Sequence, residues 1–114
     1  MIAVGGYRVG NITTRAYDDA GTLLWSRDHG ATVWAVAADR DSNVYTGGAR
    51  AGGVTTRKYD AAGNLLWSRD HGAAVDGIAV DDAGNVYTVG TGVSSVMLRK
   101  YDSAGNQTLT IDFL

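Results

Sequence analysis

Short apolar segments separated by turn signals recur along the whole chain. Three successive ones are Val75–Val80, Val86–Gly90 and Val96–Tyr101, and Asn64–Ser68 represents a fourth kind. They are rich in Val, Tyr, Thr, Trp and Ile and are bounded by Gly, Asn and Asp, which is typical of β-strands. An α-helix would need about 10–12 residues, more than any of these segments offers. The pattern therefore predicts an all-β chain.

The same segments return at a fixed interval. The tyrosines Tyr17, Tyr59 and Tyr101 are 42 residues apart, and each begins a Tyr-Asp-x-x-Gly motif. The two full repeats agree at 24 of 42 positions, so they are expected to share one structure. The whole chain, 1–114, is interpreted as one array made of these units: partial unit 1–11, repeats 12–53 and 54–95, and partial unit 96–114.

Glycines at fixed places predict the turns between the strands. Asp-x-x-Gly puts Asp first and Gly fourth, as in a type I turn followed by a residue with positive φ. The Asp side chain is expected to accept hydrogen bonds from amides of the turn. Ser42 replaces glycine in one of these turns, and the others have glycine at 21, 63, 84 and 105.

Four short antiparallel strands in a unit of about 42 residues are typical of a β-propeller blade. The segments Ile78–Gly90 and Arg57–Ser68 resemble the β-propeller repeats named after seven-bladed propellers, and more loosely the tryptophan–aspartate repeats. The resemblance covers nearly the whole chain and implies propeller blades of four antiparallel strands. It implies little about function, because such repeats serve enzymes, lectins and scaffolds alike.

The blade count raises a question of assembly. The 114 residues give about 2.7 blades of 42 residues, whereas propellers close with about 4–8 blades. The strands are expected in three groups of three, four and four, and the outermost blades would leave apolar faces bare. We therefore expect a homo-oligomer in which other copies complete the ring, two copies being the first expectation and three the second. Met1 favours this over the alternative, a fragment of a larger propeller protein.

Composition and net charge limit the classes of partner that the protein is expected to bind. The net charge is −2, which gives no electrostatic basis for binding nucleic acid. No apolar run approaches the roughly 18 residues of a membrane span, and no signal peptide is recognisable at the start. There is no cysteine for a disulfide or a zinc–thiolate site, and the compartment stays open. No membrane or nucleic-acid partner is expected.

No metal or cofactor is expected either. Asp39–Asn43 resembles the opening of a calcium-binding loop, but such a loop ends in a glutamate and this chain has none. We interpret both this segment and Asp81–Asn85 as turns. The chain also has no phosphate-binding loop, nucleophile elbow or histidine pair at ligand spacing.

The connection between each fourth strand and the next first strand holds the most chemical side chains. Arg, Asp and His together suit an anion, a sugar or a carboxylate, and an Asp–His pair could transfer protons. A repeated structural network at each blade junction is the favoured interpretation, because a site needed once would not recur in every unit. The candidate ligand-binding residues here are Arg27, Asp28, His29, Arg69, Asp70 and His71.

The connections between second and third strands differ among the units. Variable loops on a fixed scaffold are frequent contact points, so Tyr7, Arg8 and Arg50 are further candidates, with surface drift as the equal alternative. The repeated Trp25 and Trp67 are expected to pack between blades. Trp34 lies on a first strand, where it would either line the channel or, as we favour, fill the core.

Three functions remain open. The first is a non-catalytic, self-assembling binding or scaffold module that presents its loop face to a protein. The second is a carbohydrate-binding lectin with repeated sites at blade junctions. The third, an enzyme, is the least favoured and is not predicted, because two histidines, no cysteine and no glutamate leave few acids and bases.

Overall fold

A computed structural model describes residues 2–9, 12–28, 32–51, 54–70, 74–91 and 95–113, with the side chains of 7–9, 12, 50 and 51 left out. The described residues form eleven β-strands and no helix, which confirms the all-β prediction. No helix in this part of the chain is long and apolar enough to cross a membrane. The strands are β1 Ile2–Val9, β2 Ile12–Tyr17, β3 Leu23–Arg27, β4 Val33–Ala38, β5 Val44–Ala51, β6 Val54–Tyr59, β7 Leu65–Arg69, β8 Val75–Val80, β9 Val86–Thr91, β10 Val96–Tyr101 and β11 Gln107–Phe113.

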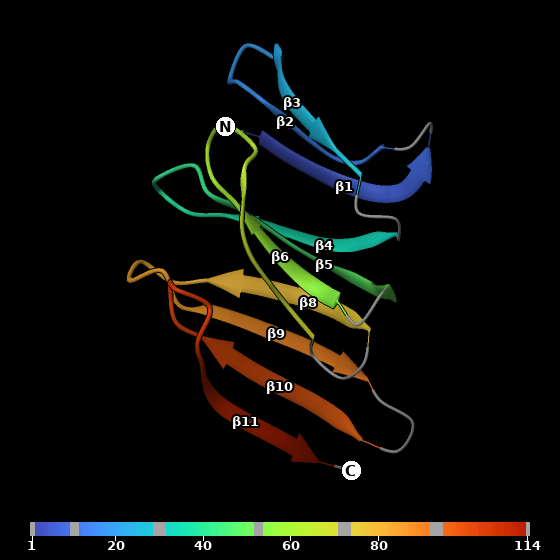
Figure 1. The fold of residues 1–114 in the computed structure, drawn as a ribbon, viewed down its shortest axis with the longest axis vertical. Helices are drawn as coiled ribbons and strands as arrows, with labels where there is room; N and C mark the ends of the chain where they lie inside the picture. The colour runs from blue at the N-terminus through green and yellow to red at the C-terminus, as the bar shows by residue number, and fades with distance from the viewer. Residues whose placement is uncertain are drawn as a thin grey trace.

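The strands form three antiparallel sheets in chain order (Figure 1). Sheet I is β1-β2-β3, sheet II is β4-β5-β6-β7 and sheet III is β8-β9-β10-β11. Each strand pairs with its neighbour in sequence, so every sheet is a simple meander. The predicted grouping of three, four and four strands is confirmed.

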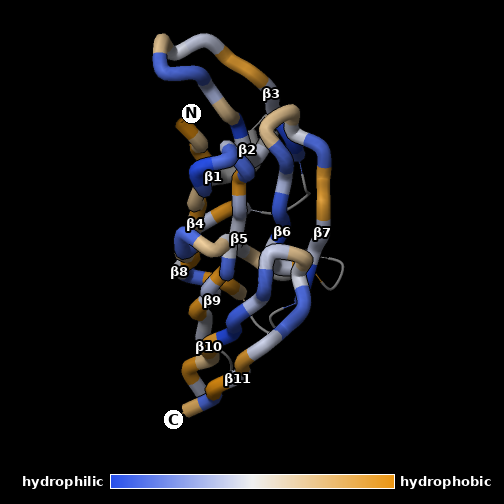
Figure 2. The backbone as a smooth tube through the Cα atoms, turned by 90° about the vertical axis from the view of Figure 1, so that its left-hand side faces the viewer, coloured by the Kyte–Doolittle hydropathy of each residue, from blue (hydrophilic) through white to orange (hydrophobic). Residues whose placement is uncertain are grey.

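The sheets follow one another in a row. β1 lies beside β4, and β4 lies beside β8. Figure 2 shows these three strands along one edge of the row and β3 and β7 toward the other. The N-terminal sheet and the C-terminal sheet stand at opposite ends of the row (Figure 1). Within the described part of the chain, each of them therefore has one face that no other sheet covers.

Two small cores fill the spaces between the sheets. Between sheets I and II the core is built around Trp25 and Tyr59, whose ring centroids are 5.4 Å apart. Between sheets II and III it is built around Trp67 and Tyr101, at 5.8 Å. The indole Nε1 of Trp67 donates to the carbonyl of Ser103 at 3.2 Å, so its polar atom is satisfied too. The prediction that these tryptophans pack between sheets is confirmed.

The turns have the predicted geometry. Asp60 shows the pattern: its carboxylate Oδ1 accepts from the amides of Ala62 and Asn64, both at 2.9 Å. The amide of Gly63 donates to the Asp60 carbonyl at 3.0 Å, and Gly63 has φ +86°. Ser42 adopts φ +64°, the same left-handed region, although it is not glycine. Glycine is preferred at such positions because it has no Cβ to clash with the backbone.

Candidate functional site

Arg27 and Arg69 are engaged in the contacts between sheets. The Nε of Arg27 donates to the carbonyl of Gly63 at 2.7 Å, and the Nε of Arg69 donates to the carbonyl of Gly105 at 2.6 Å. Each guanidinium also lies over the tryptophan two residues before it, at 5.6 and 5.4 Å from the ring centroid. These bonds agree with the structural network favoured from the sequence, and they leave fewer donors of either arginine for a ligand.

Asp28 and Asp70 lie exposed just after β3 and β7, and both have interaction partners. Each is close to a buried tyrosine of the next sheet. Burial raises the pKa of Tyr59 and of Tyr101, and the nearby carboxylates of Asp28 and Asp70 respectively add to that rise. The acids therefore belong to the junction between two sheets, as the repeat pattern indicated.

The structure does not describe the side chains of the other candidate ligand-binding residues. His29 and His71 lie outside the described residues, as do most of the residues that join the second strand of a sheet to the third. Tyr7 and Arg8 lie in β1 and Arg50 in β5, but their side chains are outside the description. Their role in binding stays a prediction.

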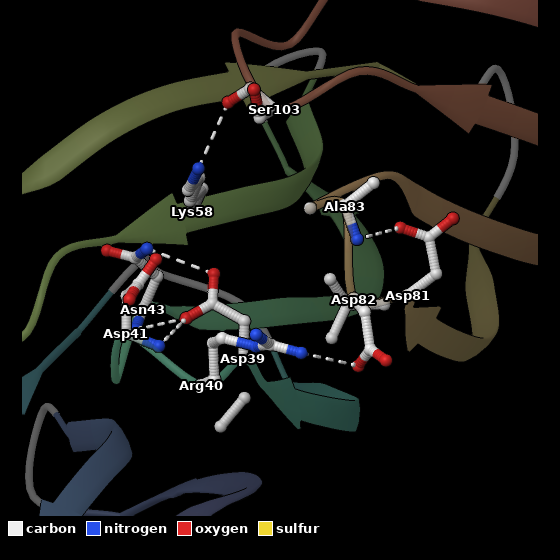
Figure 3. Close-up of a pocket in the computed structure, with 12 residues that line it drawn as sticks. Asp39, Arg40, Asp41, Asn43, Lys58, Asp81, Asp82, Ala83 and Ser103 are labelled. Carbon is white, nitrogen blue, oxygen red and sulfur yellow. Dashed lines mark hydrogen bonds and ion pairs between the residues drawn. The ribbon is translucent and has the colours of Figure 1, made fainter.

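A cavity of about 290 Å³ lies at the other end of the sheets, where the aspartate-headed turns gather (Figure 3). The turns 39–43 and 81–85 form two of its sides, and Lys58 and Ser103 complete it. From the sequence, these two segments are predicted to be turns only, and the candidate ligand-binding residues lie in other connections. Their spacing of 42 residues placed them in neighbouring sheets, but it did not indicate a hollow between them.

The cations of this cavity are already bonded to the protein. The Nζ of Lys58 donates to the Ser103 carbonyl at 3.0 Å and lies 5.3 Å from the centre of the Tyr45 ring. Arg40 Nη2 lies 3.5 Å from Asp82 Oδ1, and both side chains are exposed. An exposed pair of this kind contributes little, about 0–1 kcal/mol. The bonds around the cavity thus link sheets II and III at their turns.

The aspartates that head these turns bond within their own turns. Asp39 Oδ2 accepts from the hydroxyl of Tyr45 at 2.7 Å and from Asn43 Nδ2 at 2.9 Å. Burial raises the pKa of Asp39, but the hydrogen bonds from Asn43 and Tyr45 outweigh it and the pKa is lowered. A carboxylate whose pKa is lowered stays ionised near neutral pH and is a poor proton donor there. Among the described residues, no cluster of metal-binding side chains has three or more members.

Two bulges turn side chains out in β4 and β8, at one edge of the row of sheets. In β4, Val33 pairs with Gly48 and Ala35 with Gly47, so Trp34 is left without a partner in the ladder. Trp34 is 52% exposed, and the prediction that it fills the core is wrong. A bulge adds one residue to a strand and re-aims its side chain, which explains the exposure. Asp76 occupies the same place in β8 and is also exposed.

Comparison with known proteins does not identify the chain. No family model matches the sequence, and no curated protein matches it significantly.

Proposed function

We propose that this protein is a self-assembling β-propeller segment that acts as a non-catalytic binding or scaffold module. The supporting observation is the apolar character of the two outer sheet faces. Ala3 packs into the core between sheets I and II, so its neighbours Ile2 and Val4 face the other way. They are 50% and 51% exposed.

The outer face of sheet III has the same character. Tyr101 faces sheet II, so Leu98 and its cross-strand partners Val89 and Ile111 lie on the opposite side of the sheet. Val89, Leu109, Ile111 and Phe113 are all exposed there. Large exposed apolar patches are rare on monomers and mark interaction sites. Copies of this chain that continue the row of sheets would cover both faces and close a ring of blades.

The closed ring would present two kinds of binding surface. One is the loop face with Tyr7, Arg8 and Arg50, together with the connections after β3 and β7. The other is the inner edge, where the bulges expose Trp34 and Asp76. A partner protein bound there would meet the exposed ring of Trp34, and tryptophan is a frequent anchor in protein interfaces.

The lectin is the second candidate, and the contacts of two tryptophans weaken it. Trp25 and Trp67 are 6% and 8% exposed, and both indole N–H groups are bonded to carbonyls of the next sheet. They offer no free ring for a sugar to stack on. Trp34 is the remaining platform. Micromolar binding on a glycan array that Trp34→Ala abolishes would favour the lectin over the protein-binding module.

The mass in solution tests self-assembly. Sedimentation velocity or light scattering over a range of concentrations should give two or three times the 11.9 kDa of one chain. The assembly is driven by burial of apolar surface, so it should persist at 0.5 M NaCl. A single-chain mass at every concentration would overturn the proposal and favour the alternative that this sequence is a fragment of a larger propeller protein.

A further inference from the structure

Glycines of β1 and β5 admit the next sheet at the two internal contacts, and β1 takes the place of the second strand β5 in the 42-residue repeat. A Cβ added to Gly47 on β5 would lie 2.5 Å from Cγ1 of Val75, near the start of β8. A Cβ on Gly5 of β1 would collide with Val33 at the start of β4 in the same manner. Val33 and Val75 are buried, so neither can move aside easily. The first strand of each following sheet therefore requires glycine at this place.

Sheet III has valine at the equivalent position. Val89 is 41% exposed on the outer face. A following sheet with a first strand like β4 or β8 would bring its own valine into the space that Val89 occupies. The outer face of sheet III is therefore shaped for a sheet that has no such first strand.

Sheet I is a sheet of that kind. It has three strands, and β1 pairs with β2 alone among the described residues. Among the described residues of this sheet, no first-strand valine lies where it would meet Val89. At each internal contact, a glycine of the preceding sheet meets a valine of the following sheet. At the contact between copies, the preceding sheet would supply the valine instead, namely Val89.

The turns of the three sheets show the same difference. Gly63 and Gly105 each lie under a tryptophan of the preceding sheet, with an added Cβ only 2.8 and 2.9 Å from the indole. Gly21, the equivalent glycine of sheet I, has nothing within 4 Å of an added Cβ. Leu109 stands at the tryptophan position of sheet III and faces outward. Sheet I, which has the uncovered turn, and sheet III, which has the outward-facing leucine, stand at opposite ends of the row (Figure 1).

Val4, on the outer face of sheet I, also differs from its equivalents in the other two sheets. Its equivalents in the second strands of sheets II and III are Thr46 and Thr88, which are fully buried against the preceding sheet. Valine in place of threonine removes a hydroxyl that would need a partner. The outer face of sheet I is thus suited to an apolar neighbour such as Val89 and Ile111.

We propose that sheet III of one copy packs head-to-tail on sheet I of the next, with the side chain of Val89 taking the place that Val33 and Val75 occupy at the internal contacts. This inference rests on the proposed self-assembly and specifies its interface. The contact is heterologous, because different faces meet, and repetition of one such contact closes a ring when the rotation allows it. It continues the row of sheet contacts that already exists inside the chain.

A cross-linking experiment tests which faces meet. Trp67 packs with Val86 inside the chain, so the equivalent pair between copies is Leu109 and Ile2. The chain has no cysteine, and Ile2→Cys and Leu109→Cys proteins can be unfolded, mixed, refolded and treated with a short bismaleimide. The mixture should give cross-linked dimers in at least fivefold higher yield than either protein alone. Leu24→Cys, at an exposed leucine on the edge strand β3, is the control partner and should give no such increase.

The outcomes separate this inference from the function on which it rests. An oligomer in which each cysteine variant cross-links with itself has like faces in contact, which overturns the head-to-tail contact and leaves self-assembly standing. An oligomer without cross-links at Ile2 and Leu109 overturns it as well. A wild-type chain that stays single at all concentrations overturns the proposed function first.

Val89→Gly tests the role of the valine itself. If Val89 fills a space on sheet I, its removal leaves a cavity, and the dissociation constant of the assembly should rise about tenfold or more. Circular dichroism should show unchanged folding, since the side chain is exposed in one copy. If a segment from outside residues 1–114 supplies a first strand to sheet I, glycine should instead tighten the assembly. Tighter or unchanged association would overturn the inference.

Discussion

The space between sheets II and III and the outer face of sheet III use the same positions of the repeat but different residues. Inside, Trp67 covers Gly105, and Arg69 bonds its carbonyl. Outside, Leu109 and Ile111 stand at these positions, and neither can form such a bond. The Asp-headed turns are the same in both sheets, and so is the strand register from the turns as far as Gly47 and Val89. Beyond Gly47, sheet II has a register shift that sheet III lacks. The repeated residues therefore determine the structure of each sheet. A few positions differ between sheets, and they make each face complementary to the sheet that packs on it.

The largest expected effect concerns the tryptophan position. Trp67→Ala removes the centre of a buried core and should destabilise the chain by about 3–5 kcal/mol. Leu109→Ala, at the equivalent outer position, should cost the single chain less than about 1.5 kcal/mol, because the leucine is largely exposed before assembly. Urea unfolding at high dilution, followed by circular dichroism, measures both. A greater loss for Leu109→Ala would contradict the distinction between inner and outer faces.

The turn glycines give the next effect. Gly21 and Gly63 have φ of +85° and +86°, so alanine costs about 1–2 kcal/mol of backbone strain at either. At Gly63 the new Cβ also collides with the Trp25 ring, at 2.8 Å, which adds about 1–3 kcal/mol of overpacking. Thermal unfolding should show a lower midpoint for Gly63→Ala than for Gly21→Ala. Equal midpoints would mean that the two turns have equivalent surroundings.

Acid should produce the smallest effect and should act on inner and outer sheets alike. Hydrogen bonds from Asn64, from its amide first and its side chain second, lower the pKa of Asp60, and Asn106 does the same for Asp102. A lowered pKa stabilises the fold above the unfolded value, about 3.9, and this contribution is lost as the pH falls through the folded pKa.

The urea midpoint measured between pH 7 and pH 2.5 should therefore fall below about pH 4. The variant Asp60→Asn should have a shallower decline than the parent, since it has one fewer carboxylate to protonate. A midpoint that stays constant or rises toward pH 3 would exclude this role for the turn aspartates.

Local signals were enough to predict most of the fold. The strand segments Val75–Val80 and Val96–Tyr101 match β8 and β10 as they stand. Such segments are predictable because strand and turn preferences act within a few residues. The positive φ of Gly63 followed from the Asp-x-x-Gly pattern for the same reason. The arrangement of the sheets as propeller blades stays a prediction.

Features that depend on contacts between distant residues were harder to predict. The exposure of Trp34 follows from a bulge, whose place is set by the register against Gly47 and Gly48. An apolar side chain in an apolar strand gives no sign of it. The cavity beside Lys58 depends on how far two turns of different sheets lie apart, which no local pattern contains. The repeat did indicate that Arg69 belongs to a structural network, but not which carbonyl it would bond.

The bonds from Trp67 and Arg69 to the following turn all join residues 36 apart, as do those from Trp25 and Arg27. Among the described residues, these bonds reach only the adjacent sheet, so each sheet is stabilised mainly by its neighbours, as in a one-dimensional array. During synthesis, each new unit of 42 residues could form its sheet against the exposed face of the preceding sheet. Tandem duplication or deletion of whole units would then change the size of the assembly while leaving its local architecture intact.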